Sequence, residues 1–212
     1  MLKLDHLAIV APSLEHGAEY IRQVLGIEMP RGGKHPEMGT HNLLLRLGDD
    51  VFLEVISVDP EARSPNGPRW FGLDDQSTVQ SEWDAGRRLR AWVARTDDMD
   101  DVLQSHGDKF GQQQRVSRGD RQWLFAVKQD GSLPCDGLAP SVMDWGSRGN
   151  PASSMPDHGL SLARFEIQHP DVERVNALYE EIGIIDPPVV SRGKELCYSA
   201  TIKTPDGLKT IF

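Results

Sequence analysis

The sequence of 212 residues predicts an α+β fold built from repeated βαβββ units. One strand pattern, one helix pattern and further strand patterns follow one another in the same order three times along the chain. The closest internal matches pair segment 4–15 (LDHLAIVAPSLE) with 162–173 (LARFEIQHPDVE), and 24–28 (VLGIE) with 181–185 (EIGII). A chain of this length buries about 70% of its unfolded surface, so its core requires no disulfide or metal.

The first unit spans residues 1–58 and begins with a strand and a helix. Residues 3–10 are rich in Leu, Ile and Val, which predicts a strand. Ser13 is a favoured N-cap residue and Gly26 a favoured stop, and these bound the helix. Within it, apolar residues recur at spacings of three and four: Leu14, Ala18, Ile21, Val24 and Leu25.

Three shorter strand patterns complete this unit. A short strand is expected at 27–30, before the glycine-rich segment 31–39 (RGGKHPEMG). Segments 41–47 (HNLLLRL) and 51–56 (VFLEVI) read as strands because they are mostly apolar and flank a turn at 48–50 (GDD). The unit therefore has the order βαβββ.

The segment 59–87 is rich in Pro, Gly and Asp and is predicted to be a long loop. It carries Trp70, Phe71 and Trp83. A loop of this length without structure of its own is usually functional or mobile. Its aromatic residues either close over an apolar ligand or pack the loop onto the sheets, and the sequence leaves both alternatives open.

The second unit, residues 88–150, repeats the order with weaker patterns. Residues 88–95 predict a strand, and Asp97 or Asp98 caps a short helix that Gly107 closes. Three strand candidates follow: 115–118 (RVSR), 123–128 (WLFAVK) and 139–145 (APSVMDW).

The third unit, residues 160–212, begins with a strand at 162–169. Asp171 caps a helix that Gly183 ends. The inward face of this helix carries Val172, Val175, Leu178 and Ile182. The remaining strand candidates are 189–192 (VVSR), 197–203 (CYSATIK) and 208–212 (LKTIF).

Composition excludes several classes of protein. Acidic residues outnumber basic ones by 32 to 23, which gives a net charge of −9 and argues against a nucleic-acid partner. The apolar runs are far shorter than the about 20 residues of a membrane span, and the N-terminus lacks the pattern of a signal peptide, so we expect a cytoplasmic protein. Cys135 and Cys197 match no metal or redox spacing, and no nucleotide-binding or Ser-nucleophile motif is present.

Three segments of the first unit resemble the glyoxalase-like proteins of the vicinal oxygen chelate (glyoxalase/bleomycin resistance/extradiol dioxygenase) superfamily. These are 4–17 (LDHLAIVAPSLEHG), 32–42 (GGKHPEMGTHN) and 51–56 (VFLEVI), and the likeness is weaker over 88–145 and visible again over 160–184. The resemblance implies paired βαβββ modules whose mixed sheets curl around a cleft. It also implies lyase, isomerase, dioxygenase or resistance activity. The resemblance therefore defines the fold better than it defines the reaction.

In metal-dependent relatives, a His on the first strand and a Glu on the last strand of a module are metal ligands, and these match His6 and Glu54. Strand alternation places His6 on one face with Leu4, Ala8 and Val10, and both faces are mostly apolar. A buried carboxylate is costly unless it is paired or bound to a cation. We expect His6 and Glu54 to pair directly or through a divalent metal.

A metal requires more ligands than these two. Ala91 stands in the second unit where His6 stands in the first, and Asp144 is the one acidic candidate near the end of that unit's last strand. A site of His6, Glu54 and Asp144 with waters would hold Mn, Ni, Zn or Fe weakly. The sequence leaves metal binding open.

Other residues are candidates for binding a small-molecule substrate. The resemblance implies a GT-x-N element at Thr40 and Asn42, while His35 is expected at the rim of the cleft. Alternation turns His41 and Asn42 to opposite faces, and the sequence does not say which face lines the cleft. The substrate-binding candidates are His35, Thr40, His41, Asn42, Trp70 and Trp145.

The leading hypothesis is a small-molecule enzyme in which Glu54 is the base and the dry cleft raises its pKa. His6 or a metal would polarise a carbonyl or enol next to the abstracted proton. The alternative is a binding protein that sequesters an apolar metabolite without turnover. Because a curled sheet needs a partner, the third unit either packs on the first two or pairs with its counterpart in a second subunit, and we expect a homodimer.

Overall fold

The computed structural model describes residues 1–212 and confirms the α+β class. The helices are α1 (Leu14–Leu25), α2 (Gln76–Asp84), α3 (Met99–Phe110) and α4 (Val172–Glu181). The strands are β1 (Leu2–Val10), β2 (Arg31–His35), β3 (Thr40–Arg46), β4 (Phe52–Val58), β5 (Leu89–Arg95), β6 (Gln112–Arg118), β7 (Arg121–Val127), β8 (Ser141–Asp144), β9 (Ser161–His169), β10 (Ile184–Ile185), β11 (Val189–Arg192), β12 (Cys197–Thr204) and β13 (Gly207–Ile211).

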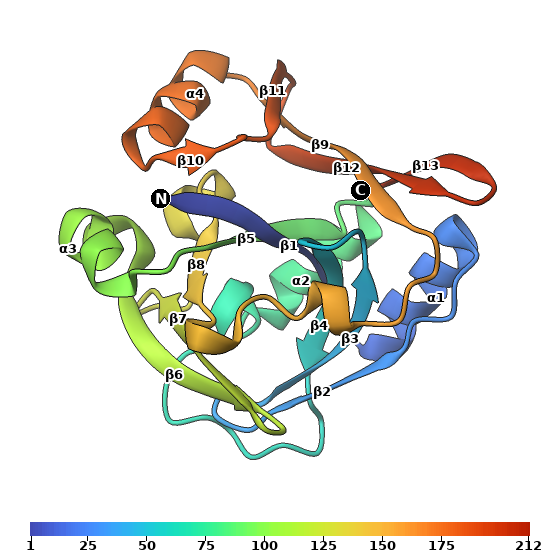
Figure 1. Cartoon of the computed structure of the whole chain (residues 1–212), viewed down its shortest axis with the longest axis horizontal. Coiled ribbons are helices and arrows are strands. Elements are labelled where there is room, and N and C mark those ends of the chain that lie inside the picture. The colour runs from blue at the N-terminus through green and yellow to red at the C-terminus, as the bar shows by residue number, and fades with distance from the viewer.

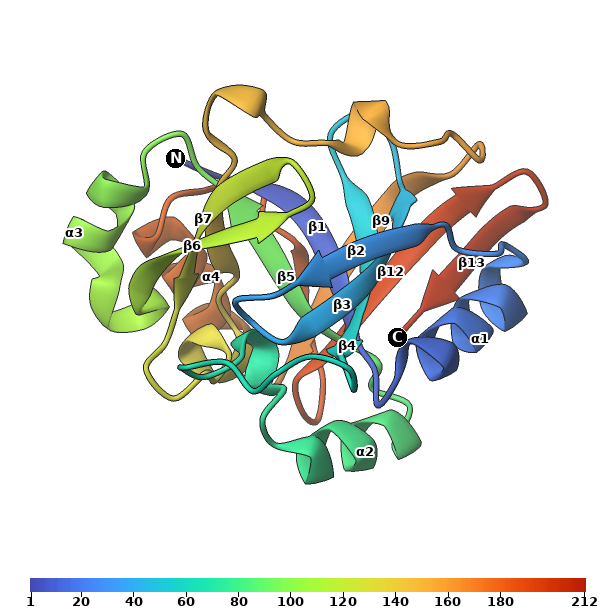
Figure 2. The same ribbon diagram turned by 90° about the horizontal axis from the view of Figure 1, so that it is seen from below.

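The main sheet has two similar halves joined at its centre (Figure 1). Its strand order is β2-β3-β4-β1-β5-β8-β7-β6, with β10 paired to β1, and β1 runs antiparallel to β5. The sheet curls until the edge strands β2 and β6 approach one another (Figure 2). Ser117 Oγ on β6 donates a hydrogen bond of 2.6 Å to Glu37 Oε1 beyond β2, which fastens this seam. The halves thus enclose a common interior.

Helix boundaries follow the expected caps. Ser13 accepts a hydrogen bond from the backbone N–H of His16, and Gly26 ends α1 in the left-handed conformation at φ 76°. Asp98 caps α3, but this helix continues past Gly107 to Phe110 across a kink, so the predicted end was wrong. The completely buried Phe110 explains the extension, because it packs the last turn into the core.

Two predictions about loops in the first part of the chain were wrong. The strand expected at 27–30 is β2 at Arg31–His35, so the glycine-rich segment is itself paired in the sheet. The segment 59–87 contains α2 and a 3-10 turn at Trp70–Gly72. Only Val79 and Trp83 of α2 are buried, a pattern too sparse to predict a helix.

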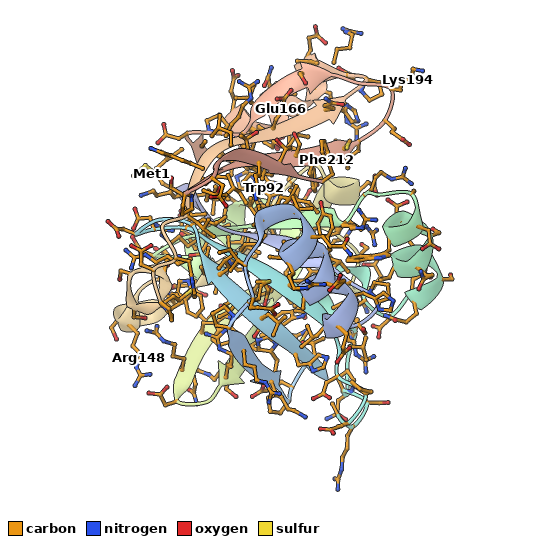
Figure 3. The ribbon with its side chains drawn as sticks, turned by 90° about the vertical axis from the view of Figure 1, so that its right-hand side faces the viewer. Met1, Trp92, Arg148, Glu166, Lys194 and Phe212 are labelled. Atoms are coloured by element: carbon orange, nitrogen blue, oxygen red, sulfur yellow. The ribbon has the colours of Figure 1, made fainter.

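The third part of the chain forms a separate four-stranded sheet with the order β11-β9-β12-β13. Its elements follow the predicted order, but β9 lies between β11 and β12, whereas β1 lies at the end of the β2-β3-β4-β1 series. This sheet and α4 stack on the outer face of the main sheet (Figure 1), and Figure 3 shows Trp92 beneath the four-stranded sheet. Trp92 contacts Phe165 and Tyr179 there. The intrachain alternative is therefore the arrangement found, and the homodimer stays a prediction.

Two hydrophobic clusters lie on opposite faces of the curled sheet. The outer cluster joins residues such as Leu7, Ile9 and Trp92 to the helices and to the four-stranded sheet. The inner cluster, which includes Ala8 and Val93, fills the interior of the curl. No helix is long and apolar enough to cross a membrane. The inner face is where polar residues gather into a site.

Candidate active site

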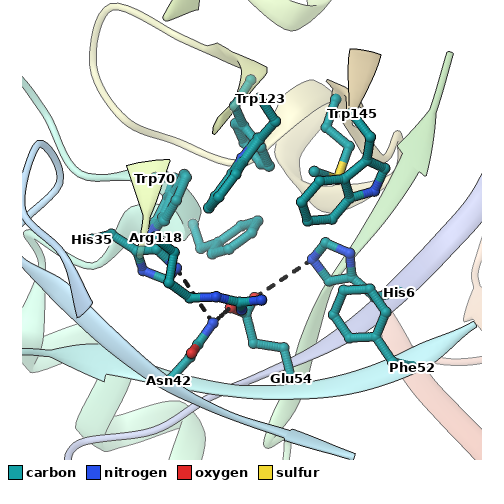
Figure 4. Close-up of a pocket in the computed structure, with 12 residues that line it drawn as sticks. His6, His35, Asn42, Phe52, Glu54, Trp70, Arg118, Trp123 and Trp145 are labelled. Atoms are coloured by element: carbon teal, nitrogen blue, oxygen red, sulfur yellow. Dashed lines mark hydrogen bonds and ion pairs between the residues drawn. The ribbon is translucent and has the colours of Figure 1, made fainter. Parts of the chain in front are cut away.

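A pocket opens on the inner face of the main sheet between its two halves (Figure 4). Its polar lining comes from His6, His35, Asn42, Glu54 and Arg118. Its apolar lining comes from Phe52, Trp70, Phe71, Trp123, Phe125, Met143 and Trp145. The free volume inside the pocket is about 20 Å³, which is enough for about one water molecule. A larger ligand therefore requires the aromatic walls to move.

His6 is held from behind by Asp5, a residue the sequence analysis missed. The pairing of β1 with β5 shifts register between Leu4 and His6, which leaves Asp5 as the extra residue of a β-bulge. The bulge overturns the predicted alternation, because Leu4 packs with the outer cluster while His6 faces the pocket. Asp5 Oδ1 then lies 2.7 Å from His6 Nδ1. The adjacent Asp-His dipeptide was the available signal.

Asp5 is completely buried and has three further partners. Trp145 Nε1 and Asn150 Nδ2 donate hydrogen bonds of 2.9 and 2.6 Å to its Oδ2, and Arg95 Nη1 lies 3.5 Å away. Burial by itself lowers the pKa of His6, but contacts with Asp5 and Glu54 outweigh it and raise the pKa to about 9. His6 is therefore an imidazolium at neutral pH.

Glu54 faces His6 across a short gap. Its Oε2 lies 3.5 Å from His6 Nε2, and its Oε1 accepts a hydrogen bond of 2.6 Å from Asn42 Nδ2. Burial acts to raise the pKa of Glu54, but the hydrogen bond and charge of His6, with the Asn42 hydrogen bond, outweigh burial and lower it. The expectation of a raised pKa was wrong, because the partners of this carboxylate outweigh its dry surroundings. The resting pair is ionised.

The orientation of Asn42 depends on the glycine pair of β2. The backbone N–H of Gly33 donates a hydrogen bond of 2.8 Å to Asn42 Oδ1, which directs the amide nitrogen toward Glu54. A Cβ added at Gly32 would lie 2.1 Å from Asn42 Oδ1 and 2.6 Å from its backbone oxygen. The absence of a side chain at Gly32 thus allows the close approach that fixes Asn42.

The histidines around Asn42 have different surroundings. His35 is buried and lines the pocket rather than its rim, with Nδ1 3.0 Å from Thr40 Oγ1 and Nε2 3.4 Å from Asn42 Nδ2. Burial lowers its pKa to about 4, so this ring is neutral at pH 7. His41 faces away from the pocket and bonds Ser57 Oγ at 2.9 Å. Thr40 supports His35, and the structure removes His41 from the candidate set.

The two halves of the sheet are related through the central strand pair. Leu7 lies opposite Trp92 across β1 and β5. The residues one position earlier, His6 and Ala91, therefore occupy equivalent places in the two halves. The register agrees with the equivalence drawn from the sequence, and the second half supplies no histidine to the pocket.

The equivalent of Glu54 follows from the same relation. Glu54 lies beside Ala8 on β1, and Ser141 lies beside the equivalent residue, Val93, on β5. Asp144, the predicted third ligand, does not line the pocket, although both neighbours in sequence do. Its carboxylate instead accepts a hydrogen bond from the backbone N–H of Gly146.

The donor set does not fit a resident metal ion. A protein-bound transition metal such as zinc takes at least three protein ligands. The pocket offers His6 Nε2 and Glu54 Oε2, while Ala91 and Ser141 stand where a symmetric cage would need the other two. No group of three or more His, Cys, Asp or Glu side chains is placed to share an ion. The structure therefore does not bring Asp144 together with His6 and Glu54.

The walls of the pocket are aromatic and come mainly from the second half and the segment before it. Trp70 and Trp123 contact the ring of His35 edge-on, at centroid distances of 5.0 and 5.8 Å. Trp145 packs on Trp123, while the ring of Phe52 stacks on His6 at 4.5 Å. Trp70 and Trp145 were predicted.

Four lining residues of the second half were not predicted: Arg118, Trp123, Phe125 and Met143. Trp123 lies in an apolar strand of uncertain facing, and Arg118 lies at the end of β6. Neither carries a local signal, because each reaches the pocket only when the sheet has curled.

A curled sheet of two βαβββ halves with a His–Glu pair on its inner face defines a protein of the vicinal oxygen chelate class. The chain belongs to the glyoxalase-like domain family, whose sequence pattern matches residues 4–183. The match confirms the resemblance seen in the first unit and extends through the second. No protein of curated function matches the sequence.

Solved structures share the fold at low identity. A hypothetical protein from Staphylococcus aureus aligns with a TM-score of 0.63 and 12% identity over 93% of this chain and 89% of that chain. A Streptomyces coelicolor methylmalonyl-CoA epimerase in complex with 2-nitronate-propionyl-CoA aligns with a TM-score of 0.44 and 17% identity, over 71% and 99% of the two chains. The Mycobacterium tuberculosis epimerase gives 0.39 and 18%, over 68% and 89%. The first likeness shows the fold alone, and the others are too distant to support more.

Proposed function

We propose that the protein is a small-molecule enzyme of the lyase or isomerase type that moves a proton at a carbon next to a carbonyl group. Glu54 is the base and protonated His6 is the acid. The observation that carries this proposal is the gap of 3.5 Å between His6 Nε2 and Glu54 Oε2, in a pocket where each residue is held by a separate partner. A pair positioned independently can act on two atoms of one ligand.

The proposed step uses both members of the pair. A substrate carbonyl oxygen accepts a hydrogen bond from His6 Nε2, while Glu54 Oε2 removes a proton from the neighbouring carbon. The electrons of that C–H bond form the C=C bond of an enol as the carbonyl oxygen takes the proton of His6. Return of a proton to carbon and of the enol proton to His6 completes an isomerisation.

Substrate binding also explains how a carboxylate of lowered pKa becomes an effective base. The contact with His6 and its charge offset the effect of burial on Glu54. A carbonyl oxygen that takes over the proton of His6 weakens this contact. The dry aromatic walls then raise the pKa of Glu54 toward that of a better base, and only when substrate is present.

Proton exchange provides the test. Wild-type protein in D2O is incubated with short 2-oxo acids and methyl ketones, and deuterium at the carbon next to the carbonyl is followed by ¹H NMR. Glu54→Gln is expected to lower the catalysed rate by about 10²- to 10⁴-fold, while the exposed control Glu61→Gln leaves it unchanged. Ligand binding without exchange above the buffer rate would replace this proposal with the binding-protein alternative.

A further inference from the structure

Arg118 is the one cation of the pocket without a partner. His6 has two carboxylates, Asp5 and Glu54, within ion-pair distance. The Arg118 guanidinium has no hydrogen bond or ion pair, although it is half-buried and burial lowers its pKa. Figure 4 shows its side chain directed into the pocket beside Asn42 and Glu54. The charge of Glu54 offsets only part of this desolvation, and no anion is hydrogen-bonded to the guanidinium.

The fold holds Arg118 in place at the seam of the curled sheet. A Cβ at Gly33 would lie 2.5 Å from Arg118 Cγ and 2.6 Å from its Cδ, so the side chain crosses β2 where a glycine leaves room. The neighbouring Ser117 is bonded to Glu37 through both its hydroxyl and its backbone N–H. These contacts with Gly33 and Glu37 join the end of β6 to the opposite edge of the sheet, and they direct Arg118 toward the pocket.

We propose that Arg118 binds the carboxylate of the substrate, and that the substrate is a small monocarboxylate with an enolisable carbonyl and a short apolar group. A guanidinium matches a carboxylate with two parallel hydrogen bonds. One free guanidinium beside Glu54 suits a single negative charge. The aromatic walls, which must move to admit any ligand, suit a short apolar group beside the carboxylate. The carbonyl group of this substrate rests on the proposed function, whereas the carboxylate is inferred from Arg118 alone.

Matched ligand pairs isolate the carboxylate. 2-Oxobutyrate is titrated beside 2-butanone, and 2-oxohexanoate beside 2-hexanone. In each ketone a methyl group replaces the carboxylate of the acid. Binding is followed by tryptophan fluorescence, because Trp70, Trp123 and Trp145 line the pocket. Each acid is expected to bind at least about tenfold more tightly than its ketone, as a charge-assisted pair provides.

Variants of one strand isolate the guanidinium. Arg118→Gln is expected to weaken binding of the acids by about 10- to 100-fold and to leave the ketones unchanged. Arg118→Lys retains part of the affinity because it keeps the charge but loses the paired geometry. Arg115→Gln is the matched control, because Arg115 is exposed on the same strand and carries the same charge. Circular dichroism is used to check that all three variants fold.

Equal binding of acids and ketones by the wild type, including no binding of either, overturns this inference. Equal effects of Arg118→Gln and Arg115→Gln also overturn it. Deuterium exchange separates it from the proposed function. If acids bind through Arg118 but no Glu54-dependent exchange is seen, the inference about Arg118 stands and the proposed enzymatic function is wrong. If ketones and acids both show Glu54-dependent exchange with no preference for acids, the proposed function stands and the inference about Arg118 is wrong.

Discussion

The two halves of the main sheet share one architecture but contribute different chemistry. The first half supplies His6, Glu54 and the residues that orient them. The second half has Ala91 and Ser141 at the equivalent positions and supplies aromatic walls and Arg118 instead. A duplicated unit that needed four similar ligands would keep both halves alike. Under the proposed function, this divergence means that one half reacts and the other encloses the ligand.

The largest expected effect comes from removing the acid of the first half. His6→Gln should slow deuterium exchange by about 10²- to 10⁴-fold, because a neutral amide cannot protonate the carbonyl oxygen as the enol forms. Ser141→Ala, at the position equivalent to Glu54, should change the rate less than about twofold. NMR exchange rates measure both. A comparable loss in Ser141→Ala would show that the halves share the chemistry after all.

Stability should differ between the acidic residues of the two halves in the same way. Asp5→Asn leaves a buried His6 cation with one carboxylate fewer, and breaking a buried pair costs about 3 to 5 kcal/mol. Asp144→Asn removes a charge from a residue outside the pocket and should cost less than about 0.5 kcal/mol. Urea unfolding at neutral pH gives both values. Equal costs would mean that Asp5 contributes no more than a peripheral acid.

The sequence predicted those features that depend on local pattern. The caps at Ser13, Asp98 and Asp171 are present because short-range hydrogen bonds define them. His6 and Glu54 were paired correctly because a polar residue in an apolar strand needs a partner wherever the strand lies. The element order of the halves followed from the same short-range signals.

Long-range geometry explains what the sequence did not reveal. The bulge that places Asp5 behind His6 interrupts the alternation on which the facing of residues was based. Arg118 reaches the pocket only because β2 and β6 meet when the sheet curls. The lowered pKa of Glu54 depends on distances to its partners, which no sequence pattern contains. The sequence also left the register of Asp144 open by a residue, and the structure places this residue outside the pocket.

The two histidines of the first half should make stability depend on pH in opposite directions. The pKa of His6 is raised in the folded state from 6.5 to about 9, so its contribution is complete below pH 6.5 and is lost as pH rises through 9. The pKa of His35 is lowered to about 4, so its contribution is complete above pH 6.5 and is lost as pH falls through 4. Maximal stability is therefore expected near pH 6.5.

Each of these losses should be on the order of 3 kcal/mol in urea unfolding. His6→Gln should flatten the alkaline side of the profile, and it should also alter the acid side because His6 is the main cause of the lowered pKa of Glu54. His35→Gln should flatten part of the acid side, where Glu54 also contributes because its pKa is lowered. A wild-type profile that is level between pH 6.5 and 9 would contradict the imidazolium assigned to His6.

The smallest expected effect concerns glycine. In the first half, Gly32→Ala would place a Cβ 2.6 Å from the backbone oxygen of Asn42, which cannot retreat without parting β2 from β3. Overpacking of this kind costs about 1 to 3 kcal/mol, and displacement of Asn42 should also loosen its hydrogen bond to Glu54 and slow exchange. In the second half, Gly107→Ala meets no atom within 4 Å and should change stability by less than about 1 kcal/mol. If Gly32→Ala loses stability but keeps the full exchange rate, Asn42 does not position the base, and the pairing of His6 with Glu54 must suffice to do so.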